Sequence, residues 1–285
     1  MAVRIGLVGC GRWGRYVLAD LRELGAEVFV ADLSGEDGAV RTAADLPAVD
    51  GVVVASPATT HAAVVRSIAE RGVPIFCEKP FTTDVAAARE LVALAGDRIH
   101  LMHIWRYHPG VECLGALARS GALGRVHGVR STRVNGPSPR LDTDPVWTLV
   151  PHDLTVAIEV LGHIPPPRAA VADVVAGRPL GLWGLCGEDP WLIIEASTRH
   201  REKRRTVSVH AEGGVAVLAG DDATAVRIER LDGVEEVPFV PEPPLRRELA
   251  AFLGHLDGGP PPKSDAAEGL AVVEAVQALR DQAGL

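Results

Sequence analysis

The chain has 285 residues, of which 47% are hydrophobic and 23% are charged, and its formal net charge is -8. This composition is typical of a globular protein with one large domain or two modest ones, and the acidic balance argues against nucleic-acid binding as its main role. No apolar run reaches about 18 residues, so we expect no membrane-spanning helix and no membrane partner. The first residues lack the charged start and cleavage site of a signal peptide, and the four cysteines lack zinc-like pairing. We therefore expect a cytoplasmic protein with reduced thiols and no metal.

The first part of the chain alternates between strand-like and helix-like segments. Strands are expected at residues 3–9, 27–32, 51–56, 73–79 and 99–104, and helices at 12–24, 59–71 and 82–96. Regular alternation of this kind implies right-handed crossovers and a parallel sheet. In such sheets, ligands bind beyond the carboxyl ends of the strands.

The remainder of the chain changes to short strands separated by turns. Strands are expected at residues 125–134, 168–176, 180–187, 191–198, 205–212, 214–220 and 225–231, and helices at about 148–162, 244–257 and 265–282. The basic run 199–205 is interpreted as a solvated hairpin turn, and the proline-rich stretch that begins at Glu236 as a turn or linker.

These elements predict two domains. We expect an α/β N-terminal Rossmann doubly wound domain at residues 1–119, and an α+β C-terminal domain with an open, mainly antiparallel sheet at 120–285. The last helix, at about 265–282, is a candidate to pack back on the N-terminal domain.

A glycine motif follows the first strand and opens the first helix. Gly9, Gly11 and Gly14 form G-x-G-x-x-G, in which glycines allow a tight turn and a close approach to a pyrophosphate, while the helix N-terminus favours that anion. Asp32 ends the second strand, where a carboxylate would accept hydrogen bonds from ribose hydroxyls and repel a 2′-phosphate. The pattern predicts NAD rather than NADP; the alternative for Asp32 is a loop or helix-cap residue. The same loop contributes two further candidate cofactor-binding residues, Arg12 and Trp13.

Two later strand ends also carry candidate residues. Ser56 and Pro57 follow the third strand and would place backbone beside the cofactor, while His61 opens the next helix. His61 either faces the site or is satisfied by backbone groups. The string CEKPF, residues 77–81, places Lys79 at the end of an apparently buried strand, although the chain contains only three lysines.

The ordered strings G-x-G-x-W-G, S-P-x-x-x-H and E-K-P resemble the glucose–fructose oxidoreductase / inositol 2-dehydrogenase (Gfo/Idh/MocA) family over the first 110 residues. The antiparallel second half and the late helix at 264–281 are compatible with it. The resemblance implies that Lys79 lies beside the nicotinamide and the reacting carbinol of the substrate. It also implies that Glu78 contacts ribose or orients Lys79, and that Pro80 follows a cis peptide bond. The alternative for Lys79 is a surface residue.

The string WTLVPHDL, residues 147–154, is similar to the family's helix that lines the active site. The resemblance implies that His152 moves the proton, which suits its pKa near neutrality. The family's aspartate position holds Thr148, which can form hydrogen bonds but cannot stabilise an imidazolium by charge. The alternative for His152 is a structural helix-cap residue. Asp153 is expected to point elsewhere, because neighbouring helix residues do not face each other.

The segment HIWRYHP, residues 103–109, is similar to the family's R-[FY]-x-P segment. Arg106 could contact the nicotinamide carboxamide or the substrate, and Tyr107 and His108 are pocket candidates. Trp147 could flank the nicotinamide, or have only a packing role.

The resemblance implies an NAD-dependent dehydrogenase that moves a hydride between nicotinamide and a ring carbinol or ketone of a sugar, sugar nucleotide or cyclitol, in a biosynthetic pathway. One alternative is an imine or ketone reductase of the same family that acts on a non-sugar, which Thr148 favours slightly. Another is a non-catalytic NAD-binding regulator, against which Lys79 and His152 argue. The open sheet face is the expected surface of a homodimer or homotetramer.

Overall fold

The computed structural model describes residues 2–35, 39–136 and 143–285. The chain forms two compact units. The first comprises Met1–Ile104 and Pro243–Val273, and the second comprises Trp105–Glu242 and Glu274–Leu285.

The first unit contains a five-stranded sheet in the order β2-β1-β3-β4-β5, in which every pair of strands is parallel. The strands are β1 (Arg4–Val8), β2 (Glu27–Ala31), β3 (Gly51–Val54), β4 (Ile75–Glu78) and β5 (Ile99–Met102). Every residue of β3, β4 and β5 is buried, as expected for parallel strands that are covered on both faces.

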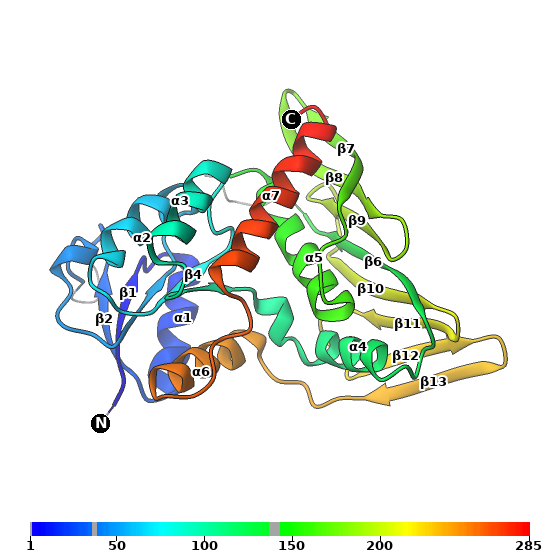
Figure 1. Cartoon of the computed structure of the whole chain (residues 1–285), viewed down its shortest axis with the longest axis horizontal. Coiled ribbons are helices and arrows are strands. Elements are labelled where there is room, and N and C mark those ends of the chain that lie inside the picture. The colour runs from blue at the N-terminus through cyan, green and yellow to red at the C-terminus, as the bar shows by residue number, and fades with distance from the viewer. Residues whose placement is uncertain (1, 36–38, 137–142) are drawn as a thin grey trace. The chain divides into compact units, whose positions relative to one another are not determined.

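Helices cover both faces of this sheet. They are α1 (Arg12–Glu23), α2 (His61–Ala69), α3 (Val85–Ala95) and α6 (Pro244–Leu256), and two short 3-10 helices, η2 (Ala43–Asp45) and η3 (Ala58–Thr60), lie in the connections. Figure 1 shows α1 and α6 on one side of the sheet and α2 and α3 on the other. The rings of Phe76 in β4 and Phe252 in α6 stack with centroids 4.9 Å apart. Helix α6 therefore completes the core of the first unit, although it lies late in the sequence.

The second unit contains an eight-stranded sheet in the order β13-β12-β11-β10-β6-β9-β8-β7. The pair β6–β9 is parallel and the other pairs are antiparallel. The strands are β6 (Val126–Val134), β7 (Pro167–Val175), β8 (Arg178–Gly187), β9 (Trp191–Ser197), β10 (Arg204–Ala211), β11 (Gly214–Ala219), β12 (Ala225–Arg230) and β13 (Gly233–Pro238). The two sheets confirm the expected fold class.

Helices α4 (Pro109–Arg119) and α5 (Pro145–Leu161) pack on one face of this sheet, as Figure 1 shows. The 3-10 helix η4 (Ile104–Tyr107) precedes α4, and the last helix, α7 (Ala266–Gln282), contributes residues to both units. Buried side chains beneath the helices include Val129, Leu192 and Ile194.

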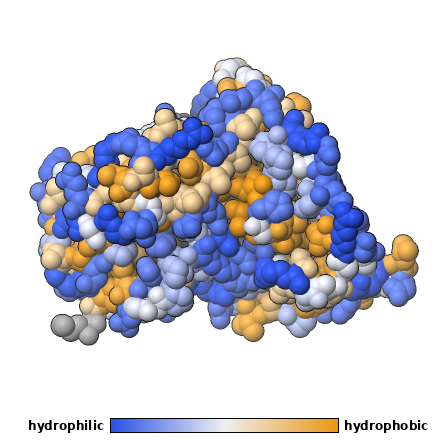
Figure 2. All heavy atoms as spheres, viewed as in Figure 1, coloured by the Kyte–Doolittle hydropathy of each residue, from blue (hydrophilic) through white to orange (hydrophobic). Residues whose placement is uncertain are grey.

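The opposite face of β7, β8 and β9 carries exposed apolar side chains. Val171 pairs with Trp183 and Leu185 pairs with Ile193 on neighbouring strands, and all four are exposed. Leu231, in the turn of the β12–β13 hairpin, is also fully exposed, and orange spheres lie at the right of Figure 2.

The observed division of the chain differs from the expected boundary at residue 119. Helix α4 belongs to the second unit because it packs closely on α5. A Cβ atom on Gly115 would lie 2.6 Å from the Glu159 carbonyl oxygen, and Arg119 Nη1 donates to the same oxygen over 2.8 Å. Residues 243–273 return to the first unit, whereas the sequence placed them in the second domain.

Three local expectations were wrong. The sequence interpretation omitted α4 and also omitted β13, which lies in part of the proline-rich stretch. The basic run at 199–205 is not a hairpin turn, because β9 and β10 both pair with β6 and not with each other. Within the described residues, the structure contains no helix with the length and apolar character needed to cross a membrane.

Candidate active site

The glycine loop of the first unit is built by close backbone approaches. Gly9 follows β1 with φ 93°, and a Cβ there would lie 2.5 Å from the backbone nitrogen of Ser56. A Cβ on Gly14 would lie 2.1 Å from the Gly9 carbonyl oxygen. A Cβ on Gly11 would meet nothing within 4 Å, so this position borders open space at the N-terminus of α1. The loop therefore fixes its own shape while it leaves room for a ligand.

Asp32 connects the end of β2 to this loop. Its Oδ2 accepts a hydrogen bond from the Cys10 backbone N–H over 2.7 Å, and its Oδ1 accepts one from the Ser34 N–H over 2.8 Å. These two bonds lower the pKa of the Asp32 carboxyl. An ionised carboxylate is therefore held beside the glycine loop.

His61 joins two neighbouring loops. Its Nδ1 lies 2.8 Å from the Pro80 carbonyl oxygen and its Nε2 lies 2.9 Å from the Ser56 carbonyl oxygen, with the side chain 1% exposed. Ser56 Oγ also lies 2.8 Å from Thr60 Oγ1. His61 thus follows the second of its two expected alternatives, in which backbone groups satisfy the ring. It positions the Ser56–Pro57 turn against the E-K-P turn.

Lys79 stands at the carboxyl end of buried β4, on the same sheet edge as the glycine loop, since the strands are parallel. Its side chain is half-buried and Glu78 is buried. The Lys79–Pro80 peptide bond is cis, as the resemblance implied.

A third acidic residue near this motif escaped the sequence interpretation. Glu248 of α6 is 0% exposed, and neither of its carboxyl oxygens has a hydrogen-bond partner. Burial and then repulsion from Glu78 raise the pKa of Glu248 well above its usual range, while the positive charge of Lys79 opposes the shift. The protonated, neutral form of Glu248 is therefore favoured in the folded protein.

In the second unit, α5 presents His152. Asp144 caps this helix by accepting from the backbone N–H groups of Val146 and Trp147, and Arg280 Nη1 donates to Asp144 Oδ2 over 2.6 Å. His152 is half-buried. Thr148, one turn earlier, donates from Oγ1 to the Pro145 carbonyl over 3.3 Å.

Trp147 is 5% exposed, and the guanidinium carbon of Arg280 lies 5.6 Å from its ring centroid. These contacts within the second unit describe a packing role for Trp147.

Trp105 is the centre of an aromatic and cationic cluster in the second unit. Its ring stacks on His108 with centroids 5.0 Å apart, and meets the His152 ring edge-on with centroids 6.4 Å apart. The guanidinium carbon of Arg133 lies 4.2 Å from the Trp105 ring centroid, a cation–π distance. Burial lowers the pKa of His108.

A buried ion pair underlies this cluster. Asp153 Oδ1 accepts hydrogen bonds from Ser131 Oγ over 2.6 Å and from Arg133 Nε over 3.0 Å, and Asp153 is 0% exposed. Burial raises the pKa of Asp153 and Arg133 opposes that shift. As expected, Asp153 points away from its neighbour His152, toward β6.

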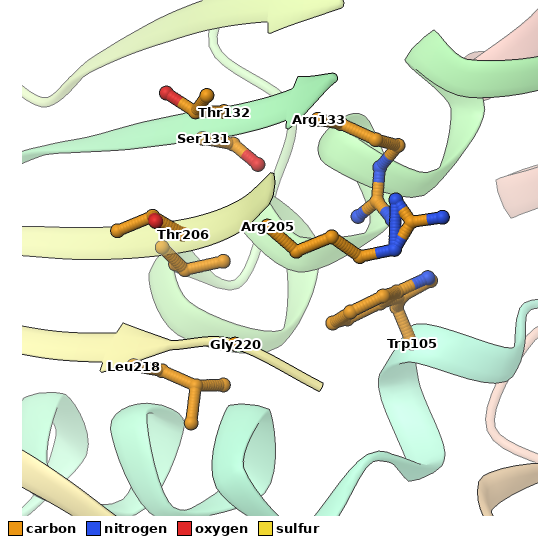
Figure 3. Close-up of a pocket in the computed structure, with 9 residues that line it drawn as sticks. Trp105, Ser131, Thr132, Arg133, Arg205, Thr206, Leu218 and Gly220 are labelled. Carbon is orange, nitrogen blue, oxygen red and sulfur yellow. The ribbon is translucent and has the colours of Figure 1, made fainter. Parts of the chain in front are cut away.

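Above the pair lies a small pocket, shown in Figure 3, into which Arg133 and Arg205 point from β6 and β10. Its lining residues are Trp105, Ser131, Thr132, Arg133, Arg205, Thr206, Val207, Leu218 and Gly220.

Two other expected site residues have protein partners. Arg106 Nε donates to Glu159 Oε2 over 3.3 Å, with the side chains 14% and 7% exposed. Tyr107 is 5% exposed. Arg106 therefore links η4 to α5, and Tyr107 is buried. Among the described residues, no group of three or more His, Cys, Asp or Glu side chains is placed to hold a metal ion.

A family profile described as "Oxidoreductase family, NAD-binding Rossmann fold" matches residues 3–104. Residues 3–104, which form most of the first unit, therefore match the NAD-binding Rossmann domain of the Gfo/Idh/MocA oxidoreductases.

Curated relatives and solved structures extend the likeness beyond that unit. UDP-N-acetylglucosamine 3-dehydrogenase of Acidithiobacillus ferrooxidans is 31% identical over 59% of this chain, but the alignment spans only 58% of that relative's length. Inositol 2-dehydrogenase of Rhizobium meliloti is 26% identical over 84% of this chain and 82% of its own length.

A solved structure of the Acidithiobacillus ferrooxidans enzyme superposes with a TM-score of 0.87 at 24% identity, and covers 99% of this chain and 98% of that one. A levoglucosan dehydrogenase in complex with NADH gives 0.88 at 17% identity, over 100% and 97% of the two chains. At these identities, the structural likeness establishes the fold.

The glycine loop and Asp32 fit the cofactor that this family binds. Gly11 leaves space beside the N-terminus of α1, which favours a pyrophosphate. The ionised Asp32 beside the loop can accept hydrogen bonds from a ribose.

The sequence interpretation missed Trp105, Arg133, Arg205 and Glu248 as site residues. One signal was present for Arg133: it follows Val129 and Ser131 at alternate positions of an expected strand, and all three share the buried face. A charged residue in that phase predicts a partner or a ligand. Arg205 was interpreted as part of the exposed basic run at 199–205. In the structure it belongs to β10, and its side chain lines the pocket.

We expect Glu248→Gln to change how stability depends on pH. In the wild type, stability from the protonated Glu248 is present below pH 4.5 and is lost as pH rises, because the unfolded chain ionises first. Relative to the wild type, the free energy of unfolding of the variant should rise between pH 5 and pH 7. Urea denaturation at both pH values measures this. A difference that does not change with pH would show that Glu248 is ionised in the folded protein.

Proposed function

We propose that this protein is an NAD-dependent dehydrogenase that transfers a hydride between nicotinamide C4 and a ring carbinol or ketone of a sugar, sugar nucleotide or cyclitol. The observation that carries the proposal is Lys79 at the carboxyl end of buried β4, on the sheet edge that holds the glycine loop, in a domain that matches this oxidoreductase family. The names of the two curated relatives, an inositol and a UDP-N-acetylglucosamine dehydrogenase, support a polyhydroxylated ring as substrate.

The proposal gives Lys79 and His152 separate roles. The Lys79 ammonium donates a hydrogen bond to the reacting oxygen and stabilises its developing negative charge. His152 takes the hydroxyl proton during oxidation and returns it during reduction. Thr148 stands where the family has an aspartate, and its hydroxyl is committed to the Pro145 carbonyl, so it adds no charge to help His152. The Trp105 ring, edge-on to His152, supports the imidazole instead.

We propose NAD over NADP on the basis of Asp32. Both of its carboxylate oxygens bind backbone N–H groups and its pKa is lowered, so it is negative at pH 7. A 2′-phosphate beside it would suffer charge repulsion, whereas ribose hydroxyls would gain an acceptor.

A second candidate function has one observation in its favour. With Thr148 in place of the carboxylate, the chain could reduce an imine or a ketone of a non-sugar, a reaction that places different demands on the proton relay. A non-catalytic regulator is disfavoured because both Lys79 and His152 are present. The cytoplasmic location and the biosynthetic role belong to the proposal and rest on the sequence.

We also propose that the protein self-associates through the exposed apolar face of β7, β8 and β9. The apolar pairs Val171–Trp183 and Leu185–Ile193 form adjacent rows there. Contiguous apolar surface of this kind marks an interaction site, and a homodimer or homotetramer is the commonest way to cover it.

Lys79→Ala should lower kcat about 10²–10⁴-fold, because the reacting oxygen loses its cationic partner. NADH binding, followed by fluorescence, should persist. The assay follows absorbance at 340 nm with a panel of cyclitols, free sugars and nucleotide sugars. Lys263→Ala is the matched control and should keep full turnover. Near-wild-type turnover by Lys79→Ala would contradict the assignment.

Asp32→Ala should weaken NAD far more than NADP. The variant loses the acceptor for the ribose hydroxyls and also the charge that repels the 2′-phosphate, so the NAD preference should fall by about 10-fold or more. Fluorescence titration with NADH and NADPH measures both dissociation constants. An equal loss of affinity for NADH and NADPH would contradict this role for Asp32.

Trp183→Glu should shift the protein toward monomers, because it places a charge in the apolar rows. Light scattering coupled to size-exclusion chromatography compares it with the wild type. Glu188→Gln, a change at an exposed site beyond β8, is the control. A wild type that is monomeric at micromolar concentration would refute the proposed surface.

A further inference from the structure

Two arginines bring like charges together in the pocket of the second unit. Arg133 and Arg205 are direct cross-strand partners on β6 and β10, and like charges in that position destabilise a sheet. Figure 3 shows both side chains converging above the Trp105 ring. Burial and then the charge of Arg133 lower the pKa of the Arg205 guanidinium, which reflects the same repulsion.

The acidic neighbours of the two arginines leave one guanidinium edge unused. Asp153 Oδ1 takes the Nε–H of Arg133, and Asp221 Oδ1 lies 3.3 Å from Arg205 Nε. Arg205 Nη1 is buried and has no hydrogen-bond partner. Asp221 is not one of the residues that line the pocket and its side chain is 36% exposed, so two guanidinium groups face the one buried carboxylate of Asp153. The interior therefore has a deficit of negative charge.

The size of the pocket limits what can enter. It encloses ≈ 10 Å³, about the space of one water molecule, and Trp105 is one of the residues that line it. Ser131 Oγ, which also lines it, already donates to Asp153. An entering group must therefore be small, must accept hydrogen bonds and must be negative. One oxygen of a carboxylate meets these conditions, because it is about the size of a water molecule, carries negative charge and accepts charge-assisted hydrogen bonds from guanidinium N–H groups.

We propose, on the basis of the proposed function, that the substrate is a sugar acid, and that Arg205 together with Arg133 binds its carboxylate. The pocket adjoins the proton-transfer residue through one side chain, since the Trp105 ring contacts both Arg133 and His152. A carboxylate held by the arginines would fix one end of the sugar, and its ring would lie over Trp105 toward His152. Sugars without a negative charge would leave Arg205 Nη1 unpaired, so they would bind more weakly.

The test compares acids with uncharged analogues of nearly the same shape. Calorimetry on the NADH-loaded protein measures binding of glucuronate against glucuronamide, and of galacturonate against galactose. Turnover of the same compounds with NAD is followed at 340 nm. The wild type should bind at least one acid about 10- to 100-fold more tightly than its uncharged partner, as expected for a charge-assisted hydrogen bond.

Arg205→Gln should reduce that ratio to about 1 to 3, and Arg205→Lys should restore part of it, because an ammonium keeps the charge without the fork. Arg204→Gln removes the same charge from the exposed neighbouring position of β10, so it should keep the wild-type ratio. A thermal unfolding midpoint equal to that of the wild type shows that each variant is folded, and unchanged NADH binding shows that the nucleotide loop in the other unit is intact.

Three outcomes would overturn the inference: no preference for an acid in any pair, a preference that survives in Arg205→Gln, or a stronger Arg205-dependent preference for glucose 6-phosphate than for any carboxylate. The failure of the proposed function looks different. In that case no compound yields NADH, while the calorimetric ratio and its loss in Arg205→Gln still report whether the pocket binds a carboxylate.

Discussion

The second unit is organised around the buried ion pair of Asp153 and Arg133, whose side chains are 0% and 2% exposed. The pair joins α5 to β6, so the helix that carries His152 is held at a fixed register on the sheet. Removing either partner would leave an uncompensated buried charge, which typically costs about 3–5 kcal/mol. The same bond directs the guanidinium of Arg133 over Trp105, which contacts His108 and His152 in turn. One interaction thus sets the positions of the aromatic, basic and titratable groups of this unit.

The first unit builds its site by another principle. Its loops are shaped by backbone atoms that come too close for side chains, as at Gly9 and Gly14. The imidazole of His61 then holds the Ser56 and Pro80 carbonyls in place. Backbone shape suits a cofactor whose pyrophosphate is always the same, whereas the side-chain cluster of the second unit can vary with the substrate.

This contrast explains how much could be predicted from the sequence. The glycine loop, Asp32 and the E-K-P turn follow strand ends in a regular order, so local pattern was sufficient to find them and to predict the parallel sheet. Helix α4 was missed because its cap is His108, an uncommon capping residue that accepts from the Gly110 N–H. Strand β13 was missed because it lies at the exposed edge of the sheet and buries no side-chain row. The sequence interpretation assigned Arg205 to an exposed turn. Its surroundings are formed by β6, which is about 70 residues away in the chain, and the local sequence does not specify that β10 pairs with β6.

The scarcity of lysine has a practical consequence for chemical labelling. The chain contains three ε-amino groups, on Lys79, Lys203 and Lys263, among 29 basic residues. Arginine does not react with acylating reagents, so almost all of the basic side chains remain unmodified by them. Lys203 is exposed and forms an ion pair with Asp221, whereas Lys79 is half-buried at the end of β4. An amine-reactive probe therefore produces a very simple modification map in which one of three internal peptides reports directly on the E-K-P turn, with little background from the rest of the molecule.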